Sequence, residues 1–332
     1  MNKFLLTFLC TILLPTSLLA DKKTEANDTL HTYDIEEVYV YDQPKETYRL
    51  SQQPLNSTTF SRLQLNSLNT QDLRQLSAFV PSFVMPEYGS RYTSSMYMRG
   101  IGSRVNSPAV GMYVDGMPIQ SKSAFNFHTY DIDRVDVLHG PQGTLYGMNT
   151  EGGLIRLYSK NPFEYQGTDL KLSLGNKFWR KAEIGHYAKL NAKTGLAISA
   201  FYDGQNGFFT NKYNGKHADK YNEFGGKAQL LWIPNQRLNL SFVADYQYVN
   251  QNGFPYGQIV TKEQIAAANI TSPYYGLEAG TQAPNQNRPS AYKRTILNTG
   301  ANIKYNGNGF VLTSMTSWQI LRDDMTMDKD SS

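Results

Sequence analysis

The sequence predicts an α+β unit followed by antiparallel strands of a membrane β-barrel. Three observations support this fold class. Residues 131–160 form a β-prone stretch with five glycines between Gly140 and Gly153. From about residue 166 onward, apolar and polar residues alternate with a period of two over one segment after another. The connections between these segments are alternately short and long, as in outer-membrane barrels with short periplasmic turns and long extracellular loops.

Residues 1–20 have the layout of a secretory signal peptide. Lys3 precedes an apolar run from Phe4 to Leu14, and Ala20 stands just before a polar stretch. The run is too short to cross a bilayer as a helix. The alternative is a buried helix, which the small residue and the polar flank disfavour. We therefore expect an exported chain.

Composition excludes several classes of protein. Cys10, inside the expected signal peptide, is the single cysteine, so the mature chain has neither a disulfide framework nor a thiolate metal site. The net charge is only +4, and Lys and Arg are scattered, which does not suggest nucleic acid as a partner. The 23 Tyr and 16 Phe, with a mean hydropathy of −0.48, fit an exported β-protein.

Residues 21–60 are predicted to form a flexible polar arm with one β-prone island. The island consists of Asp34, Ile35, Glu36, Glu37, Val38, Tyr39 and Val40. Taken by itself, it is a short edge strand or a linker pattern of no consequence. An extended segment of this kind can also be captured by a partner protein through strand addition.

Residues 61–160 are predicted to form one helix and several short strands. Apolar residues repeat at helical spacing between Thr70, the expected N-cap, and Pro81, which stops the helix. Asp115 and Gly116, between two apolar runs, predict a β-hairpin with a type I′ turn. A unit of about a hundred residues can hold a modest core of its own.

About seven strands are predicted after residue 166. Each alternating segment has roughly the ten residues that a tilted transmembrane strand needs, and several carry an aromatic residue near one end. The alternating positions run from Leu170 to Leu174, Ala182 to Leu190, Leu196 to Tyr202, Phe224 to Trp232, Leu238 to Tyr248, Leu297 to Tyr305 and Phe310 to Ile320.

The connections separate a membrane barrel from a soluble β-sandwich, which also alternates apolar and polar residues. Residues 191–195, 234–236 and 306–309 are tight turns. Residues 203–221 and 250–292 are long, polar and rich in Tyr, Asn and Gly. This asymmetry, apart from a short first loop near residues 175–180, favours the barrel.

Several ordered motifs resemble the plug domain of TonB-dependent outer-membrane receptors. The main one runs from Arg134 to Gly147 and reads RVDVLHGPQGTLYG. Met98–Gly100 and Tyr113–Pro118 match two further stretches upstream, and Glu151–Ile155 matches the strand that closes the plug. The signature positions are Arg99, Gly100, Asp115, Gly116, Gly140, Pro141, Gly143, Gly147, Gly152 and Gly153. The resemblance covers roughly residues 34–330.

The resemblance implies a globular plug inside a large β-barrel in the outer membrane of a Gram-negative cell. It implies uptake of a scarce, bulky nutrient, most often an iron–siderophore complex, energised by the inner-membrane complex through TonB. The island at residues 34–40 is then the candidate TonB box. The expected domains are a signal peptide at 1–20, an arm at 21–60, a plug at 61–162 and the first barrel strands at 163–332.

About seven strands are too few for such a barrel. The family's transporters have 22 strands around a plugged lumen, and an open sheet would leave backbone edges in lipid. We therefore expect the chain to be the amino-terminal part of a receptor, cut short. The alternatives for function are a passive pore or adhesin on a barrel scaffold, or a non-functional receptor fragment.

Cargo contacts are expected on outward loops of the plug, where cationic and aromatic side chains suit an anionic, aromatic-rich iron chelate. The candidates are Tyr88, Arg91, Tyr92, Arg104, Phe125, Phe127 and His128. The same residues are equally suited to line the interface between plug and barrel.

No enzyme motif is present in the sequence. The glycine-rich stretch lacks the Gly-Lys-Ser/Thr ending of a phosphate-binding loop, and no G-x-S-x-G elbow occurs. The five histidines lack metal-site spacing such as H-E-x-x-H. We expect no catalytic residues, no metal and no cofactor; the expected partners are TonB, membrane lipid and a small-molecule cargo.

Overall fold

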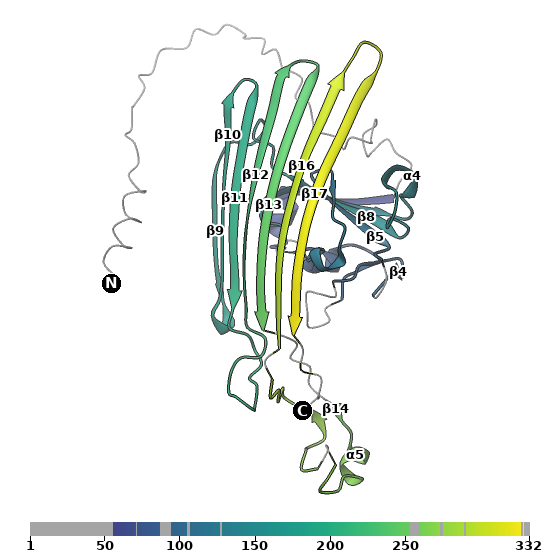
Figure 1. Ribbon diagram of the computed structural model, residues 1–332, viewed down its shortest axis with the longest axis vertical. Helices are drawn as coiled ribbons and strands as arrows, with labels where there is room; N and C mark the ends of the chain where they lie inside the picture. The colour runs from purple at the N-terminus through teal and green to yellow at the C-terminus, as the bar shows by residue number, and fades with distance from the viewer. Residues whose placement is uncertain are drawn as a thin grey trace, which may run out of the picture. The chain divides into compact units, whose positions relative to one another are not determined.

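The computed structural model describes residues 56–70, 72–86, 94–104, 107–126, 128–252, 259–272, 275–288, 290–326 and 328 (Figure 1). The expected signal peptide, most of the arm and the candidate TonB box at 34–40 lie outside these residues. In the part of the chain that is described, no helix is long and apolar enough to cross a membrane.

The first part of the chain, here called the plug unit, is built on a five-stranded sheet with the order β1-β7-β8-β5-β6. All neighbours are antiparallel except β5 and β8, which are parallel. The strands are β1 (Asn56–Ser61), β5 (Val110–Val114), β6 (Met117–Pro118), β7 (Ile132–His139) and β8 (Gly153–Ser159). A smaller sheet joins β2 (Phe83–Val84), β3 (Tyr97–Met98) and β4 (Ile101–Gly102). The predicted α+β class is confirmed.

Short helices connect these strands. They are α2 (Arg62–Ser67), α3 (Leu73–Leu76), η2 (Ser77–Phe79), η4 (Lys122–Ala124) and α4 (Gly143–Tyr146). The expected N-cap at Thr70 is wrong: α3 begins after Asp72, whose carboxylate accepts a hydrogen bond from the Gln75 backbone N–H. The Thr70 hydroxyl instead donates to the Leu65 carbonyl. A carboxylate two residues further on competes successfully because it also carries the negative charge that a helix N-terminus favours.

The hairpin predicted at Asp115 and Gly116 is present between β5 and β6. Both residues have positive φ, at 49° and 83°, as a type I′ turn requires. Val114 and Met117 are the pair that closes the turn. The predicted type I′ turn is therefore confirmed.

The core of the plug unit lies between the helices and one face of the five-stranded sheet. Leu73 and Leu76 of α3, Phe125, and Val135 and Val137 of β7 are all fully buried in one cluster. The glycine-rich stretch closes the other end of β7. A Cβ on Gly153 would lie 2.6 Å from the carbonyl oxygen of Leu138, so the close approach of β8 to β7 requires glycine there.

A seven-stranded antiparallel sheet follows the plug unit, with the order β17-β16-β13-β12-β11-β10-β9 (Figure 1). Its strands are β9 (Gly167–Gly175), β10 (Trp179–Asn191), β11 (Thr194–Gln205), β12 (Tyr221–Asn235), β13 (Leu238–Asn252), β16 (Ala291–Asn306) and β17 (Val311–Thr326). They are 9 to 16 residues long, enough to cross a bilayer when tilted. Within the described residues, β9 and β17 are the two edges and the sheet is not closed.

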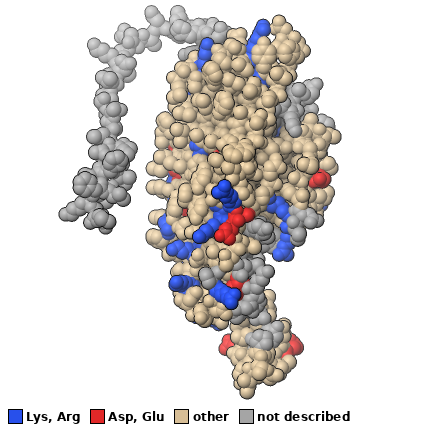
Figure 2. Space-filling model, viewed as in Figure 1, with Lys and Arg blue, Asp and Glu red and all other residues tan. Residues whose placement is uncertain are grey.

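The alternating residues share one face of this sheet, called the outer face. One cross-strand row on that face consists of Leu170, Ile184, Ala200, Gly226, Tyr246, Leu297 and Ile320. Leu170 is 65% exposed and Ile184 52% exposed. Figure 2 shows a broad uncharged area over the strands on the face turned to the viewer. This is the composition expected of a lipid-facing surface.

The opposite, inner face of the sheet is buried and polar. Lys227 and Asp245 face each other across β12 and β13, and Asn298 continues the row on β16. All three are buried because the plug unit packs against this face. Polar residues inside and apolar residues outside are the inverse of a soluble sandwich, and they confirm the interpretation of the alternation.

The connections follow the predicted asymmetry. β10 and β11, β12 and β13, and β16 and β17 are joined by short turns, while residues 206–220 and the segment between β13 and β16 are long (Figure 1). A 3-10 helix, η5 (Asn176–Phe178), makes the short first connection. The longest connection contains β14 (Ile259–Val260), α5 (Lys262–Ala266) and β15 (Gly280–Thr281).

Candidate functional site at the plug and sheet interface

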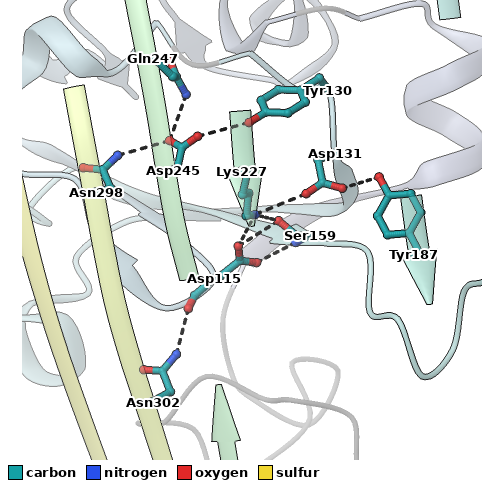
Figure 3. A network of polar contacts seen from close by, with 10 residues as sticks. All are labelled: Asp115, Tyr130, Asp131, Ser159, Tyr187, Lys227, Asp245, Gln247, Asn298 and Asn302. Atoms are coloured by element: carbon teal, nitrogen blue, oxygen red, sulfur yellow. Dashed lines mark hydrogen bonds and ion pairs between the residues drawn. The ribbon is translucent and has the colours of Figure 1, made fainter. Parts of the chain in front are cut away.

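A buried lysine joins the plug unit to the inner face of the sheet. The Nζ of Lys227, on β12, lies 2.5 Å from Oδ2 of Asp115 and 3.6 Å from Oδ2 of Asp131 (Figure 3). It also donates a hydrogen bond to the Ser159 hydroxyl. One cation from the sheet thus meets two carboxylates and a hydroxyl from the plug unit.

The plug residues of this contact come from three different elements. Asp115 is the first residue of the type I′ turn, Asp131 precedes β7, and Ser159 ends β8. The carboxylate of Asp115 accepts hydrogen bonds from the Ser159 N–H (2.7 Å) and hydroxyl (2.9 Å), so turn and strand end are fixed together. Asn302, on β16, adds a hydrogen bond from its side-chain amide to the Asp115 carbonyl oxygen.

Two tyrosines and two amides complete the network (Figure 3). The Tyr187 hydroxyl donates to Oδ1 of Asp131 over 2.5 Å, from β10 to the plug unit. The Tyr130 hydroxyl donates to Oδ1 of Asp245 over 3.2 Å, from the plug unit to β13. Gln247 and Asn298 donate to the other oxygen of that carboxylate. The network therefore links the plug unit to β10, β12, β13 and β16.

The network has more negative than positive charge. Lys227 is its single cation, while Asp115, Asp131 and Asp245 are its acids. Burial raises the pKa of Asp131 above its ordinary range, although the neighbouring lysine opposes the shift. An interface of this kind holds its parts in register and separates at a lower cost than an apolar core of equal area, because each polar group can be hydrated after separation.

A second polar contact lies nearer the long connections. His128 is 4% exposed, and its Nε2 lies 2.9 Å from Oε2 of Glu223 on β12. Glu223 and Asp203 are direct cross-strand partners of β12 and β11. The Phe201 ring packs on the imidazole with centroids 4.3 Å apart.

Inside the plug unit, the signature residues around Asp136 form a buried ion pair. Arg156 donates from Nη2 to Oδ2 of Asp136 over 2.9 Å and from Nη1 to the Tyr146 hydroxyl over 3.0 Å. The Tyr113 hydroxyl donates to the carbonyl oxygen of Tyr146. These bonds tie β5, β7, β8 and α4 together, so this part of the signature serves the architecture of the plug.

The other signature positions lie at turns. Arg99 and Gly100 both have positive φ and form the turn between β3 and β4. Gly140, Pro141, Gly143 and Gly147 lie in the connection from β7 to β8, where the Gly140 N–H donates to the Gly152 carbonyl. Apart from Asp115, these residues shape the plug unit and do not enter the contact with Lys227.

The predicted cargo residues fall into three groups. Phe125 is fully buried in the core of the plug unit, and His128 is buried where the plug unit meets the sheet. Arg104 is exposed, and its carbonyl oxygen accepts a hydrogen bond from Lys122. Tyr88, Arg91, Tyr92 and Phe127 lie outside the described residues. A cargo role for any of them stays a prediction.

A cavity of ≈ 670 Å³ interrupts the contact between the plug unit and the first two strands of the sheet. Arg62, Lys160 and Tyr165 line it from the plug side, and Lys171 and Tyr187 line it from the sheet. The interface therefore combines polar contacts, apolar packing such as Ile296 of β16 in the plug core, and open space.

Comparisons with known proteins agree with this structure. Residues 49–154 match the TonB-dependent Receptor Plug Domain. The pesticin receptor of Yersinia pestis is 33% identical over 110 residues, which cover 32% of this chain and 16% of that receptor. The catecholate siderophore receptor Fiu of Escherichia coli is 26% identical over 288 residues, covering 83% of this chain and 35% of Fiu.

The fold also matches a solved receptor. The ferric yersiniabactin uptake receptor FyuA of Yersinia pestis superposes with a TM-score of 0.70 at 19% identity, covering 83% of this chain and 42% of FyuA. The chain therefore spans less than half the length of these relatives.

Plug domain and sheet together identify the class. Residues 49–154 are the plug domain of a TonB-dependent receptor, as the motifs indicated, and the chain shares the fold of the uptake receptor FyuA. Members of this family are outer-membrane proteins, and they are transporters, not enzymes, which confirms the non-enzymatic prediction.

Proposed function

We propose that this chain is part of a receptor that takes up a scarce, bulky nutrient across the outer membrane with energy supplied through TonB. The observation that carries the proposal is the polar contact between Lys227 and the plug unit. A stopper held by hydrogen bonds and ion pairs to the inner face of barrel strands can be released and reseated. A passive pore or an adhesin has no use for such a stopper.

The partners follow from the same reading. The segment Asp34–Val40 is the proposed TonB box, captured through strand addition by TonB and its inner-membrane complex. The outer face of the sheet is proposed to contact outer-membrane lipid. The proposal also includes the domain boundaries. These are a signal peptide for export at residues 1–20, an arm at 21–60, a plug at 61–162 and barrel strands at 163–332.

A ferric siderophore is the proposed cargo. The relatives named as a catecholate siderophore receptor and as a ferric yersiniabactin uptake receptor support this choice. The cationic and aromatic residues of the plug loops, such as Arg104, suit an anionic iron chelate. Tyr88, Arg91, Tyr92, Phe125, Phe127 and His128 complete the set proposed from the sequence.

Deleting residues 34–40 in the complete receptor tests this function. Iron-starved cells are given a panel of radioiron-loaded siderophores, and uptake is compared in strains with and without TonB. We expect uptake of at least one siderophore to need both TonB and residues 34–40. Deletion of the neighbouring seven residues, 41–47, is the matched control and should leave uptake in place. Uptake that persists without residues 34–40 and without TonB would support the passive pore.

A further inference from the structure

Two carboxylates face each other directly on the inner face of the sheet. Asp203 of β11 and Glu223 of β12 are cross-strand partners, and both side chains are buried. Like charges directly opposite on neighbouring strands destabilise a sheet. Burial increases the cost, because neither charge is screened by water. A positive charge close to both carboxylates would therefore stabilise the pair.

The plug unit places a histidine at this pair. The Nε2 of His128 lies 2.9 Å from Oε2 of Glu223, and ligand atoms of the imidazole and both carboxylates lie within 4.8 Å of one another. Neither ring nitrogen of His128 forms a hydrogen bond of regular geometry among the described residues. The imidazole is thus close to both acids without being oriented as a donor to either.

Other charged groups nearby have partners of their own. Lys181, which faces Asp203 across β10 and β11, holds its Nζ 2.6 Å from Oε1 of Glu183. On the plug side, Asp72 forms its ion pair with Arg74 over 3.0 Å.

We propose that His128, Asp203 and Glu223 form a site for a divalent cation of the zinc class, which links the plug unit to two strands of the sheet. A double positive charge matches the two carboxylates, whereas a protonated imidazole supplies only one. An imidazole nitrogen with two carboxylate oxygens is a donor set that zinc accepts, at bond lengths of about 2.0–2.2 Å. Magnesium and calcium prefer all-oxygen sites, so the histidine selects against them.

The carboxylate of Asp203 is held in place by neighbouring donors. The Trp179 indole N–H donates to its Oδ1 over 2.9 Å, and the Tyr221 hydroxyl donates to the same oxygen over 3.2 Å. Hydrogen bonds of this kind orient a ligating carboxylate, and their loss weakens metal binding. The three ligating residues come from the plug unit, β11 and β12, so a bound cation acts as a cross-link between them. Cation binding at this site requires neither cargo nor TonB.

Zinc binding to the purified, detergent-solubilised protein tests the site. Equilibrium dialysis against zinc chloride, followed by elemental analysis, is expected to give one tightly bound equivalent in the unmodified protein. The variants His128→Gln and Glu223→Gln should lose it, and Trp179→Phe should weaken it by about 10–100-fold. His186→Gln is the matched control, because His186 is exposed on the outer face and pairs with Thr168. It should retain the equivalent.

Two results would overturn the proposal. The first is that His128→Gln binds as much zinc per protein as the unmodified protein. The second is that His186→Gln loses as much zinc as His128→Gln, because zinc would then be bound by surface histidines. A variant that fails to fold does not end the test, because crystals of the unmodified protein soaked in zinc provide a second measurement. An anomalous-difference peak between His128, Asp203 and Glu223 is expected, and a map without one contradicts the site.

Discussion

Lys227→Met is expected to loosen the plug unit from the sheet by about 3 kcal/mol. The substitution removes the cation 2.5 Å from Asp115 and 3.6 Å from Asp131 while keeping a side chain of similar length. Removing one partner of a buried ion pair typically costs about 3–5 kcal/mol, because the other charge stays buried. The lower end applies here, since Asp115 keeps two hydrogen bonds from Ser159 and Asp131 keeps one from Tyr187.

Amide hydrogen exchange of β5 and β8 measures this change in the complete receptor in detergent. Exchange of protected amides reports the free energy of local opening. A loss of about 3 kcal/mol corresponds to exchange that is roughly 100-fold faster in these two strands. The strands of the sheet that do not contact the plug unit should keep their exchange rates.

Lys293→Met is the control, because Lys293 is exposed on the outer face of β16. The reasoning is refuted if Lys227→Met exchanges like the unmodified protein, or if the control accelerates exchange equally. Combining Lys227→Met with Asp115→Asn adds a further check. The two residues are in contact, so their effects should fall short of additivity by about 0.5–3 kcal/mol.

Three further predictions concern the plug unit and the outer face. Gly153→Ala should destabilise the plug unit by about 1–3 kcal/mol in urea unfolding, because its Cβ would lie 2.6 Å from a carbonyl oxygen of β7. Gly143→Ala is the control and should not destabilise it, because the space around its Cβ is open. For Asp72, burial acts to raise the pKa, but the Arg74 guanidinium and the helix N–H outweigh it and lower the pKa. Asp72→Asn should therefore lower the free energy of unfolding by about 1–2 kcal/mol at any pH above about 4, the pKa of Asp in the unfolded chain. This difference between the two proteins should disappear as the pH falls through the lower pKa that Asp72 has in the folded protein. Ile184→Arg, on the outer face, should cost about 2–4 kcal/mol and shift heat-modifiable migration to lower temperature.

The sequence predicted those features that depend on neighbouring residues. The Asp115–Gly116 turn needs two adjacent residues that accept positive φ, and both have it. The period of two places Leu170, Ile184 and Tyr246 on one face, because alternation is a property of each strand alone. The predicted helix cap was wrong, since Thr70 and Asp72 are both good caps and the sequence pattern did not weigh the charge of Asp72 at the helix N-terminus.

The contacts between plug unit and sheet were beyond the sequence for a different reason. Lys227 meets Asp115 only through the register of β12 and the docking of the plug hairpin, which no local pattern specifies. His128, Asp203 and Glu223 likewise lie far apart along the chain, so they show no metal-site spacing. The sequence did contain one indication of this interface. Lys227 and Asp245 lie on the face of their strands opposite the apolar residues, which indicates a polar inner face.

A cross-link between the plug hairpin and the sheet tests most directly whether the plug must part from the sheet during uptake. A Cβ on Gly300, in β16, would lie 2.8 Å from Cγ of Met117, so the two positions face each other closely enough for a cross-link between two cysteines to be engineered. The paired variant Met117→Cys and Gly300→Cys, in the complete receptor, is assayed for TonB-dependent uptake of a radioiron-loaded siderophore. We predict that uptake stops when the disulfide is formed and returns when it is reduced. Full uptake with the cross-link intact would contradict the account.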